Sequence, residues 1–239
     1  MDVKVTEAVR EARSILVITG AGVSAESGIP TFRDPGGWWK TYRPEQLATQ
    51  AAFDRDPAEV WRWYDRRRTV IAGAEPNGAH LALARAVEGG RRVVIVTQNV
   101  DDLHERAGSR DVLHVHGLIW RLRCTADGSL FEDRRVPLPE IPPRCRCGAF
   151  ARPDVVWFGE TLETTVVQTI DALVREPFDV VLVVGTEATF GYIRDWARHA
   201  RSGGALLVEV NPRATELTPD VDGRLEGTAA EILPSILCQ

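Results

Sequence analysis

The sequence predicts an α/β protein with a doubly wound, mostly parallel sheet and a second, smaller domain. Apolar, β-branched runs that end at glycine or at polar residues are the first observation behind this prediction, because such runs are typical of buried parallel strands. The second is the alternation of these runs with helical segments along the chain. The third is a turn, Gly20-Ala21-Gly22, directly after the first strand, Ile15–Thr19.

Length and composition set the broad class of protein. The 239 residues suffice for one large domain with a smaller insertion, and the net charge of −5 gives no basic surface for nucleic acid. No apolar run approaches membrane-spanning length, and the N-terminal segment MDVKVTEAVREARS predicts an amphipathic helix rather than a signal peptide. Four cysteines, two of them in Cys145-Arg146-Cys147, argue against a disulfide framework. We expect a cytoplasmic protein that binds neither nucleic acid nor membranes.

The elements follow in order from the spacing of apolar residues. A helix is expected over residues 3–12, and no strand is expected between residues 20 and 91, where helices over 57–72 and 77–88 form an insertion that leaves the sheet. The remaining strands are expected at 93–97, 112–115, 155–157, 180–184 and 205–210. The helices between them are expected at 100–107, 163–175 and 190–201. This order predicts a Rossmann-like sheet.

The turn after the first strand has the pattern G-x-G-x-x-A, which is typical of dinucleotide-binding turns. Gly20 permits a tight turn, and Gly22 lets backbone N–H groups approach a pyrophosphate. Ser24 and Ser27 are expected near the start of the next helix, where they can donate to phosphate.

The segment after this turn differs from the pattern of a dehydrogenase. Residues 28–37 are rich in glycine and proline and predict a long loop, where a dehydrogenase has a helix and a second strand. We expect this loop to form a lid over the cofactor, with Phe32 and Arg33 facing it.

Two motifs resemble those of the sirtuins, a family of NAD-dependent protein-lysine deacylases. GAGVSAESGIPTFRD, residues 20–34, is similar to the family's cofactor-loop signature, and residues 97–108 are similar to its motif TQN-x-D-x-LH-x-x-AG. The resemblance extends over about residues 5–236. It implies that Gly20, Ala21, Gly22, Ser24 and Arg33 hold NAD, and that Gln98, Asn99 and Asp101 contact the nicotinamide and its ribose. Without it, Asn99 and Asp101 would be interpreted as helix caps.

A division into domains follows from these elements. Residues 1–34, 91–119 and 153–239 are expected to form the Rossmann-like NAD-binding domain, and residues 35–90 the cofactor loop and helical insertion. Residues 120–152, rich in arginine, proline and cysteine, are expected to form a small module similar to a degenerate zinc ribbon.

The segment His114-Val115-His116-Gly117 supplies a candidate base. Strand alternation predicts that both histidines lie on one face of a strand that Gly117 ends. Histidine suits proton transfer because its ordinary pKa lies near neutrality. The resemblance assigns catalysis to His116, and we interpret His114 as structural support and His80 and His104 as helix residues.

Later segments resemble further parts of the NAD site. Gly185 and Thr186 end an apolar strand as the family's G-T-S motif does, but Glu187 replaces the serine. A carboxylate beside a pyrophosphate is unfavourable unless it turns to a ribose hydroxyl or to solvent. By resemblance, Asn211 lies at the adenosine ribose, and Ala229 lies in the final loop, residues 227–231, which closes over the adenine.

Residues 152–160 resemble the segment that pairs with an acyl-lysine peptide in sirtuins. An extended peptide can add to such a segment as a strand, which gives affinity that tolerates many sequences. The positions concerned are Val156, Trp157, Phe158 and Gly159. The alternative is a core strand, and both interpretations can hold together.

The cysteine region departs from the two C-x-x-C pairs that are usual for a sirtuin zinc site. Asp127 stands where the second cysteine is expected after Cys124, and Cys145 and Cys147 are separated by only one residue. Three thiolates and the Asp127 carboxylate are permitted zinc ligands. The alternative is that the cysteines hold no metal and the module depends on packing.

The helix expected at 57–72 carries an arginine in an apolar stripe. Val60, Tyr64, Arg67 and Ile71 share one face, and Arg67 either extends its charge to water or binds a carboxylate with help from the Tyr64 hydroxyl. Sirtuins that prefer succinyl- and malonyl-lysine carry this Tyr-x-x-Arg pair and an alanine sixteen positions earlier, here Ala48. The resemblance therefore favours the carboxylate-binding role.

Together these features predict an NAD-dependent protein-lysine deacylase with acyl-lysine proteins as substrates. The resemblance implies that nicotinamide leaves, that His116 deprotonates a ribose hydroxyl, and that free lysine and acyl-ADP-ribose are released. Two alternatives remain open: NAD hydrolysis or ADP-ribosyl transfer at the same site, and a non-catalytic NAD-binding module.

Overall fold

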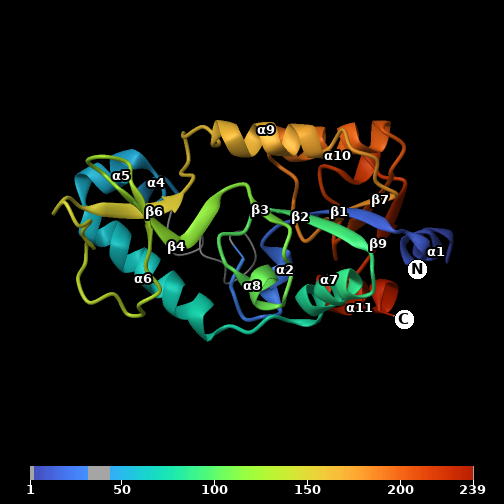
Figure 1. Ribbon diagram of the computed structural model, residues 1–239, viewed down its shortest axis with the longest axis horizontal. Coiled ribbons are helices and arrows are strands. Elements are labelled where there is room, and N and C mark those ends of the chain that lie inside the picture. The colour runs from blue at the N-terminus through green and yellow to red at the C-terminus, as the bar shows by residue number, and fades with distance from the viewer. Residues whose placement is uncertain (1–2, 32–43, 239) are drawn as a thin grey trace. The chain divides into compact units, whose positions relative to one another are not determined.

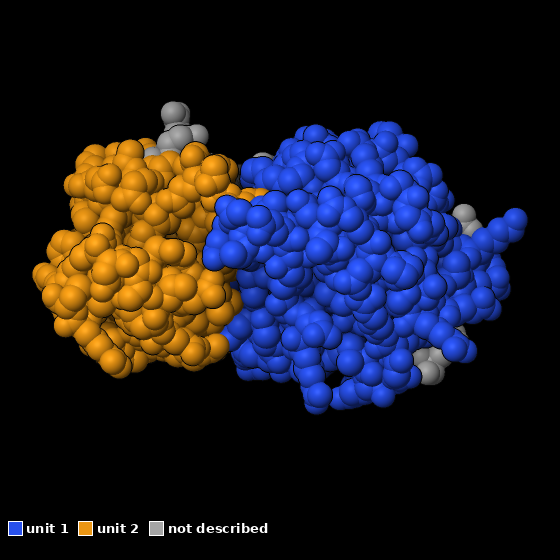
Figure 2. Space-filling model, turned by 45° about the horizontal axis from the view of Figure 1, so that its top comes forward, with its two compact units in different colours: residues 1–27, 75–115, 163–239 blue, residues 28–74, 116–162 orange. Residues whose placement is uncertain are grey.

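The computed structural model describes residues 3–31 and 44–238. The chain divides into two compact units, shown in different colours in Figure 2. The first unit contains residues 1–27, 75–115 and 163–239, and the second contains residues 28–74 and 116–162. These bounds assign residues 28–34, 75–90, 116–119 and 153–162 differently from the division expected from the sequence. Among the described residues, no helix is both long and apolar enough to cross a membrane.

A six-stranded parallel sheet is the centre of the first unit. Its strand order is β3-β2-β1-β7-β8-β9, and every neighbouring pair is parallel. The strands are β1 (Ser14–Thr19), β2 (Arg92–Thr97), β3 (Val112–His114), β7 (Val180–Val184), β8 (Leu206–Val210) and β9 (Gly223–Leu225). The order reverses between β1 and β7, the position where such sheets bind ligands beyond the carboxyl ends of their strands. The predicted doubly wound fold class is confirmed.

Helices cover both faces of this sheet. The ribbon in Figure 1 shows α9 and α10 on one face and α7 and α11 on the other. The helices of this unit are α1 (Val3–Glu11), α2 (Gly22–Ala25), α7 (Gly78–Glu88), α8 (Leu103–Arg106), α9 (Thr164–Leu173), α10 (Gly191–Ser202) and α11 (Ala229–Leu237), with a 3₁₀ turn at Thr218–Asp220. The main apolar core lies where α1, α7 and α11 pack on the sheet. The central strand β7 is apolar and buried along its whole length, as expected where helices cover both faces of a sheet.

Within its described residues, the second unit combines three helices with a three-stranded antiparallel sheet in the order β5-β4-β6. Its elements are α4 (Pro44–Leu47), α5 (Gln50–Arg55), α6 (Pro57–Gly73), β4 (Gly117–Cys124), β5 (Leu130–Glu132) and β6 (Ala151–Val155). Asp56 caps α6 by accepting from the Glu59 N–H at 2.9 Å, and Pro57 follows in the first turn. Trp61 fixes α6 to β6, because its indole N–H donates to the Ala151 carbonyl at 2.7 Å.

Two expected elements differ from the structure, and further elements of the structure were not expected. The strand expected at 155–157 does not return to the parallel sheet: it ends as β6 at Val155 and pairs with β4 in the second unit. The helix expected at 100–107 is a single turn, Leu103–Arg106, because Asp101 turns back to accept from the Leu103 N–H at 3.1 Å. The strand β9 and the helix α11 were not among the expected elements.

The two histidines of the His114–Gly117 segment do not share a strand. β3 ends at His114, His116 lies in a turn, and Gly117 begins β4 instead of ending β3. Gly117 has φ of +81°, and a Cβ there would lie 2.1 Å from the Asp154 carbonyl oxygen. Glycine therefore lets the chain turn and pack closely against β6 at this point.

Two buried histidines link the stability of the first unit to pH. His80 on α7 and His104 on α8 have ring centroids 4.8 Å apart, and neither is more than 1% exposed. Burial lowers the pKa of His80 from 6.5 to about 4. Burial, helped by the charges of His80 and His114, lowers the pKa of His104 well below 6.5. Both rings are therefore neutral in the folded protein near neutral pH.

We expect the free energy of unfolding to fall as the pH is lowered from about 6.5 toward 4, because the unfolded histidines bind protons in this range and the folded ones do not. Each histidine contributes at most about 1.4 kcal/mol per pH unit. Urea unfolding at several pH values measures the slope. His80→Gln should reduce this slope by up to about 1.4 kcal/mol per pH unit. Equal slopes in wild type and His80→Gln would contradict this assignment.

Candidate active site

The loops after β1 and β7 pack so closely that they require glycine. A Cβ on Gly20 would lie 2.6 Å from the Thr186 Cβ, and one on Gly22 would lie 2.8 Å from the Gly185 Cα. The N–H of Gly22 donates to the Gly185 carbonyl at 2.8 Å. This amide is thus engaged within the protein, and the close approach that Gly22 permits here is to the loop after β7. The G-x-G pattern here joins two loops at the reversal point of the sheet, and Ala21 lies between the two glycines.

Polar side chains connect the loops after β2, β7 and β8. Gln98 donates to the Thr186 hydroxyl at 2.9 Å, and Asn211 donates to the Thr186 carbonyl at 3.1 Å. Thr186 and Asn211 are both buried. Residues predicted from separate motifs therefore meet at the carboxyl edge of the parallel sheet, and a dinucleotide fits that edge.

Asn99, Ser24 and Asp101 form a buried hydrogen-bonded chain. The Asn99 amide donates to the Ser24 hydroxyl at 3.0 Å, and this hydroxyl donates to the Asp101 carboxylate at 3.1 Å. Burial raises the pKa of Asp101, and hydrogen bonds from the Leu103 N–H and from Ser24 oppose the rise. Ser24 therefore orients both candidate nicotinamide-site residues. Ser27 lies farther along and accepts from the Asn77 amide at 3.0 Å.

The departures from the family motif after β7 have a local structural explanation. Glu187 lies 3.7 Å from the Arg213 guanidinium, and both side chains are exposed. The glutamate charge therefore has a cationic partner at the protein surface. Ala188 is buried and has φ of 51°, a left-handed conformation that strains a residue other than glycine.

Ala229 lies in the first turn of α11 and not in a loop. At the start of this helix the Thr228 N–H donates to the Glu231 carboxylate at 3.3 Å. The Ala230 N–H donates to the Glu26 carboxylate at 3.0 Å, which joins the start of α11 to the segment that follows α2. Phe32 and Arg33, expected in the lid, lie outside the described residues.

His116, the candidate base, lies in the second unit and is half-buried. Its carbonyl accepts from the Val156 N–H at 3.0 Å. Gly117 and Val155 are partners in the pairing of β4 with β6 just beyond this bond. The segment predicted to bind the peptide is therefore attached by its backbone to the residue predicted to act as base.

The predicted acyl-site and peptide-site residues contact one another within the second unit. The Trp157 indole N–H donates to the Tyr64 hydroxyl at 2.9 Å, and the Phe158 N–H donates to the Ala48 carbonyl at 2.9 Å. Ala48 and Tyr64 are buried, whereas Phe158 is 43% exposed and is followed by Gly159 at φ +85°. Burial raises the pKa of Tyr64, so its hydroxyl stays protonated and can donate.

Arg67 is buried next to Tyr64. Only 6% of the residue is exposed. Its charge therefore does not extend to bulk water, which was one of the two interpretations of Arg67 from the sequence. The guanidinium carbon lies 4.8 Å from the Trp63 ring centre and 5.4 Å from the Tyr64 ring centre. These aromatic faces hold the cation in place, and a guanidinium in such a position can bind a carboxylate through two parallel hydrogen bonds.

The sequence did not point to Arg152 and Glu160, which support the peptide segment. Arg152 forms two contacts with the Glu160 carboxylate, and its guanidinium lies 3.4 Å from the Trp157 ring centre. Glu160 also accepts from the Trp157 N–H at 2.8 Å. The Arg-x-x-x-x-Trp-x-x-Glu spacing carries no general signal for this arrangement, because it depends on how the chain folds after β6.

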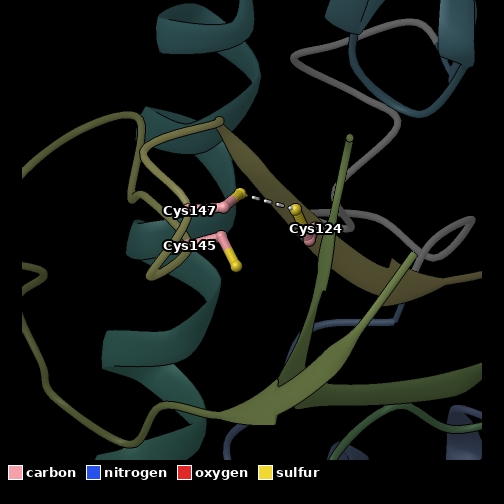
Figure 3. A group of neighbouring side chains, drawn as sticks. All are labelled: Cys124, Cys145 and Cys147. Atoms are coloured by element: carbon pink, nitrogen blue, oxygen red, sulfur yellow. Dashed lines mark hydrogen bonds between the residues drawn. The ribbon is translucent and has the colours of Figure 1, made fainter. Parts of the chain in front are cut away.

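Three cysteines meet in the second unit, as Figure 3 shows. Cys124 ends β4, and Cys145 and Cys147 lie in a tight loop that Gly148 closes at φ +89°. The three sulfur atoms lie within 4.8 Å of one another, with Cys124 and Cys147 3.5 Å apart. Ligands of a tetrahedral zinc ion at about 2.3 Å would be separated by about 3.8 Å. The three thiols therefore fit a zinc ion.

Asp127 lies beside this cluster without being part of it. Hydrogen bonds from Ser129, and then one from the Cys124 thiol, lower the pKa of the Asp127 carboxyl group. Among the described residues, only the three cysteines have all their donor atoms within the 4.8 Å limit. The fourth ligand of a tetrahedral zinc ion would thus be water, or the Asp127 carboxylate after a small movement of this side chain.

We expect the zinc to be removed by a chelator more easily than from a four-cysteine site, because a thiolate is replaced by carboxylate or water. Elemental analysis before and after exposure to EDTA measures this. Asp127→Cys should slow the loss of zinc by about tenfold or more, and Asp127→Ala should not. Wild-type zinc that resists the chelator as well as zinc in Asp127→Cys would contradict the expectation.

The parallel sheet, the reversal point and the loops around it define an α/β protein of the dinucleotide-binding class. A family model described as the Sir2 family matches residues 20–190. The chain is 47% identical over 234 residues to NAD-dependent protein deacylase 2 of Pyrobaculum aerophilum, covering 98% of this chain and 93% of that relative. The chain therefore belongs to the Sir2 family, the sirtuins.

Solved structures agree with this family. The crystal structure of a Sir2 homologue in complex with NAD has a TM-score of 0.92 at 43% identity, covering 99% of this chain and 93% of that one. A Sir2 protein with a deacetylated p53 peptide and 3′-O-acetyl ADP-ribose has a TM-score of 0.87 at 27% identity, covering 98% of this chain and 96% of that one. The fold of this chain is thus the Sir2 fold.

Proposed function

We propose that the protein is an NAD-dependent protein-lysine deacylase that removes succinyl and malonyl groups as well as acetyl groups. The products are free lysine, nicotinamide and acyl-ADP-ribose. Membership of the Sir2 family and the deacylase relative at 47% identity support the reaction class. The loops around Gly20, Gln98, Thr186 and Asn211 support NAD as the cosubstrate, since they lie where such sheets bind dinucleotides.

Bound NAD supplies the ADP-ribosyl group that accepts the acyl chain, with nicotinamide as the leaving group. Asn99 and Asp101, held by Ser24, bind and orient the nicotinamide end. His116 accepts the proton of a ribose hydroxyl, which a neutral imidazole can do near neutral pH. Phe158 and its neighbours hold the acyl-lysine peptide, and Phe158 is 43% exposed. Cys124, Cys145 and Cys147 hold zinc as a structural ion of the second unit.

One observation supports the acyl preference more than any other: Arg67 and Tyr64 are buried side by side, and Tyr64 is bonded to the peptide segment through Trp157. Burying a guanidinium costs free energy unless a charged or aromatic partner offsets it. Tyr64 accepts from Trp157, and no acceptor for its own proton is found among the described residues. A substrate carboxylate would accept from both Tyr64 and Arg67.

A panel of peptides that differ only in the acyl group tests this function. Acetyl-, malonyl-, succinyl- and glutaryl-lysine versions of one sequence are incubated with and without NAD, and free lysine peptide is measured. We expect turnover only with NAD, and higher kcat/KM for the malonyl and succinyl peptides than for the acetyl peptide. Turnover of the acetyl peptide alone would reject the acyl preference, and no turnover of any peptide would reject the deacylase.

A further inference from the structure

The ring of His114 lies between two hydrogen-bond acceptors in the first unit. Nδ1 lies 3.1 Å from the carbonyl oxygen of Asn99, and Nε2 lies 2.6 Å from the Glu105 carboxylate. Because a carbonyl and a carboxylate both accept, each ring nitrogen must carry a proton to bond to its partner. The imidazole is only 14% exposed, so water does not replace either partner easily. This geometry requires a cationic, doubly protonated His114.

The surroundings of His114 within the first unit favour the cation. Glu105 on α8 and Asp101 after β2 are acidic, and His104 on α8 is a neutral ring. Burial lowers the pKa of His114, but the hydrogen bond and charge of Glu105, the Asn99 carbonyl and the charge of Asp101 together raise it above 6.5. The other ionisable groups of the neighbouring elements include Asp102 at the start of α8 and Arg106 at its end, which pairs with Glu75. They also include Arg110 and Asp111 before β3, Arg92 at the opposite end of β2, and Asp171 on α9, which accepts from Trp196.

The loop that contains Asn99 and Asp101 is held on its other side by Ser24. The Asn99 side chain donates to Ser24, which donates to Asp101, while the Asn99 main chain accepts from His114. The two residues expected to bind the nicotinamide end of NAD are thus anchored from α2 and from β3. Loss of the β3 anchor would release the Asn99 carbonyl, while the Asn99 N–H keeps its bond to the Thr97 hydroxyl at 3.1 Å.

We propose that His114 and Glu105 form a positioning pair that fixes the Asn99–Asp101 loop for the nicotinamide riboside half of NAD. The inference deepens the proposed function and rests on it for the identity of the ligand. Neither residue touches the reacting atoms. They act through the Asn99 carbonyl, which the cationic ring holds.

Deprotonation of His114 breaks one of the two bonds. The remaining proton stays on the nitrogen that faces Glu105, because a hydrogen bond to a carboxylate is stronger than one to a neutral carbonyl. The Asn99 carbonyl is then released. Affinity for NAD is therefore highest below the pKa of His114 and falls as the pH rises through it, whereas affinity for ADP, which lacks the nicotinamide riboside, stays constant.

Calorimetric titration with NAD and with ADP across neutral and alkaline pH tests the pair. His114→Phe keeps a ring but removes both bonds, and we expect it to weaken NAD binding about tenfold with ADP binding unchanged. Glu105→Gln keeps an acceptor without its charge, and we expect it to lower the pH at which NAD affinity falls by about one unit. Glu75→Gln is the matched control. It removes the charge of an exposed ion-pair partner of Arg106, and Arg106 lies on α8 next to Glu105.

The ring itself can be observed by ¹⁵N NMR of histidine-labelled protein, with His114→Phe assigning the signal. Two protonated nitrogens at neutral pH are the expected result, and a single protonated nitrogen overturns the inference. An NAD-to-ADP affinity ratio in His114→Phe equal to that of wild type also overturns it, while leaving the proposed function intact. Wild-type protein that binds ADP but not NAD would reject the proposed function and this inference with it.

Discussion

Replacing His116 by alanine is expected to lower kcat/KM for deacylation by about 100-fold or more while leaving the affinity for NAD nearly unchanged. Alanine cannot accept the proton of the ribose hydroxyl. The backbone contact of residue 116 with the Val156 N–H does not depend on the side chain, so the peptide segment should keep its place. Steady-state kinetics with an acylated peptide, together with NAD titration, measure the two effects separately.

His114→Ala is an informative comparison for this experiment. The two histidines are close in sequence but only His116 is assigned to proton transfer, so His116→Ala should affect kcat and His114→Ala should mainly affect the affinity for NAD. Near-normal turnover in purified His116→Ala, with folding confirmed by circular dichroism, would show that His116 is not the base.

The second large effect is expected at Arg67. Arg67→Met should lower kcat/KM for a succinyl peptide by about 30- to 1000-fold, because a charge-assisted, two-point contact in a partly dry site contributes roughly 2–4 kcal/mol. Methionine retains an unbranched apolar side chain that can pack next to Trp63 and Tyr64 without the guanidinium. Acetyl-lysine has no carboxylate, so its turnover should be unchanged or higher. The measured quantity is the ratio of succinyl to acetyl kcat/KM.

Three further variants separate charge, geometry and general damage to α6. Arg67→Lys keeps the charge without the planar fork, and should lose part of the succinyl activity. Tyr64→Phe removes one donor and should shift the ratio in the same direction by less. Arg62→Met changes an exposed arginine on the same helix and should leave the ratio unchanged. If Arg67→Met has the wild-type ratio, Arg67 is a structural residue held by aromatic rings and the acyl class is wrong.

The parallel sheet was predictable because its signals are local. Each of its long strands is an apolar run, and the glycines that end β1 and β7 mark positions where backbones meet. The motif around Asn99 likewise marked the carboxyl end of β2. These features need only the residues of one strand and the loop that follows it.

Other features depend on partners far away in the sequence. The turn at His116 follows from the close approach of Gly117 to Asp154, and the bond between Tyr64 and Trp157 joins residues 93 positions apart. The cysteines meet only because β4 and the loop around Cys145 fold together. Such contacts are set by packing in the second unit, where the sequence shows weak periodicity. His114 and Glu105 are only nine positions apart and lie in the first unit, and their pairing was missed because β3 and α8 had to be placed first.

The most direct test of the deacylase is the identity of the product made from NAD. The protein is incubated with NAD and a succinyl-lysine peptide, and the ADP-ribose products are identified by mass spectrometry, with oxygen-18 water included to detect hydrolysis. We expect succinyl-ADP-ribose and free lysine peptide in equal amounts, formed only when both substrates are present. Plain ADP-ribose formed at the same rate without the peptide would identify an NAD hydrolase and contradict the proposed function.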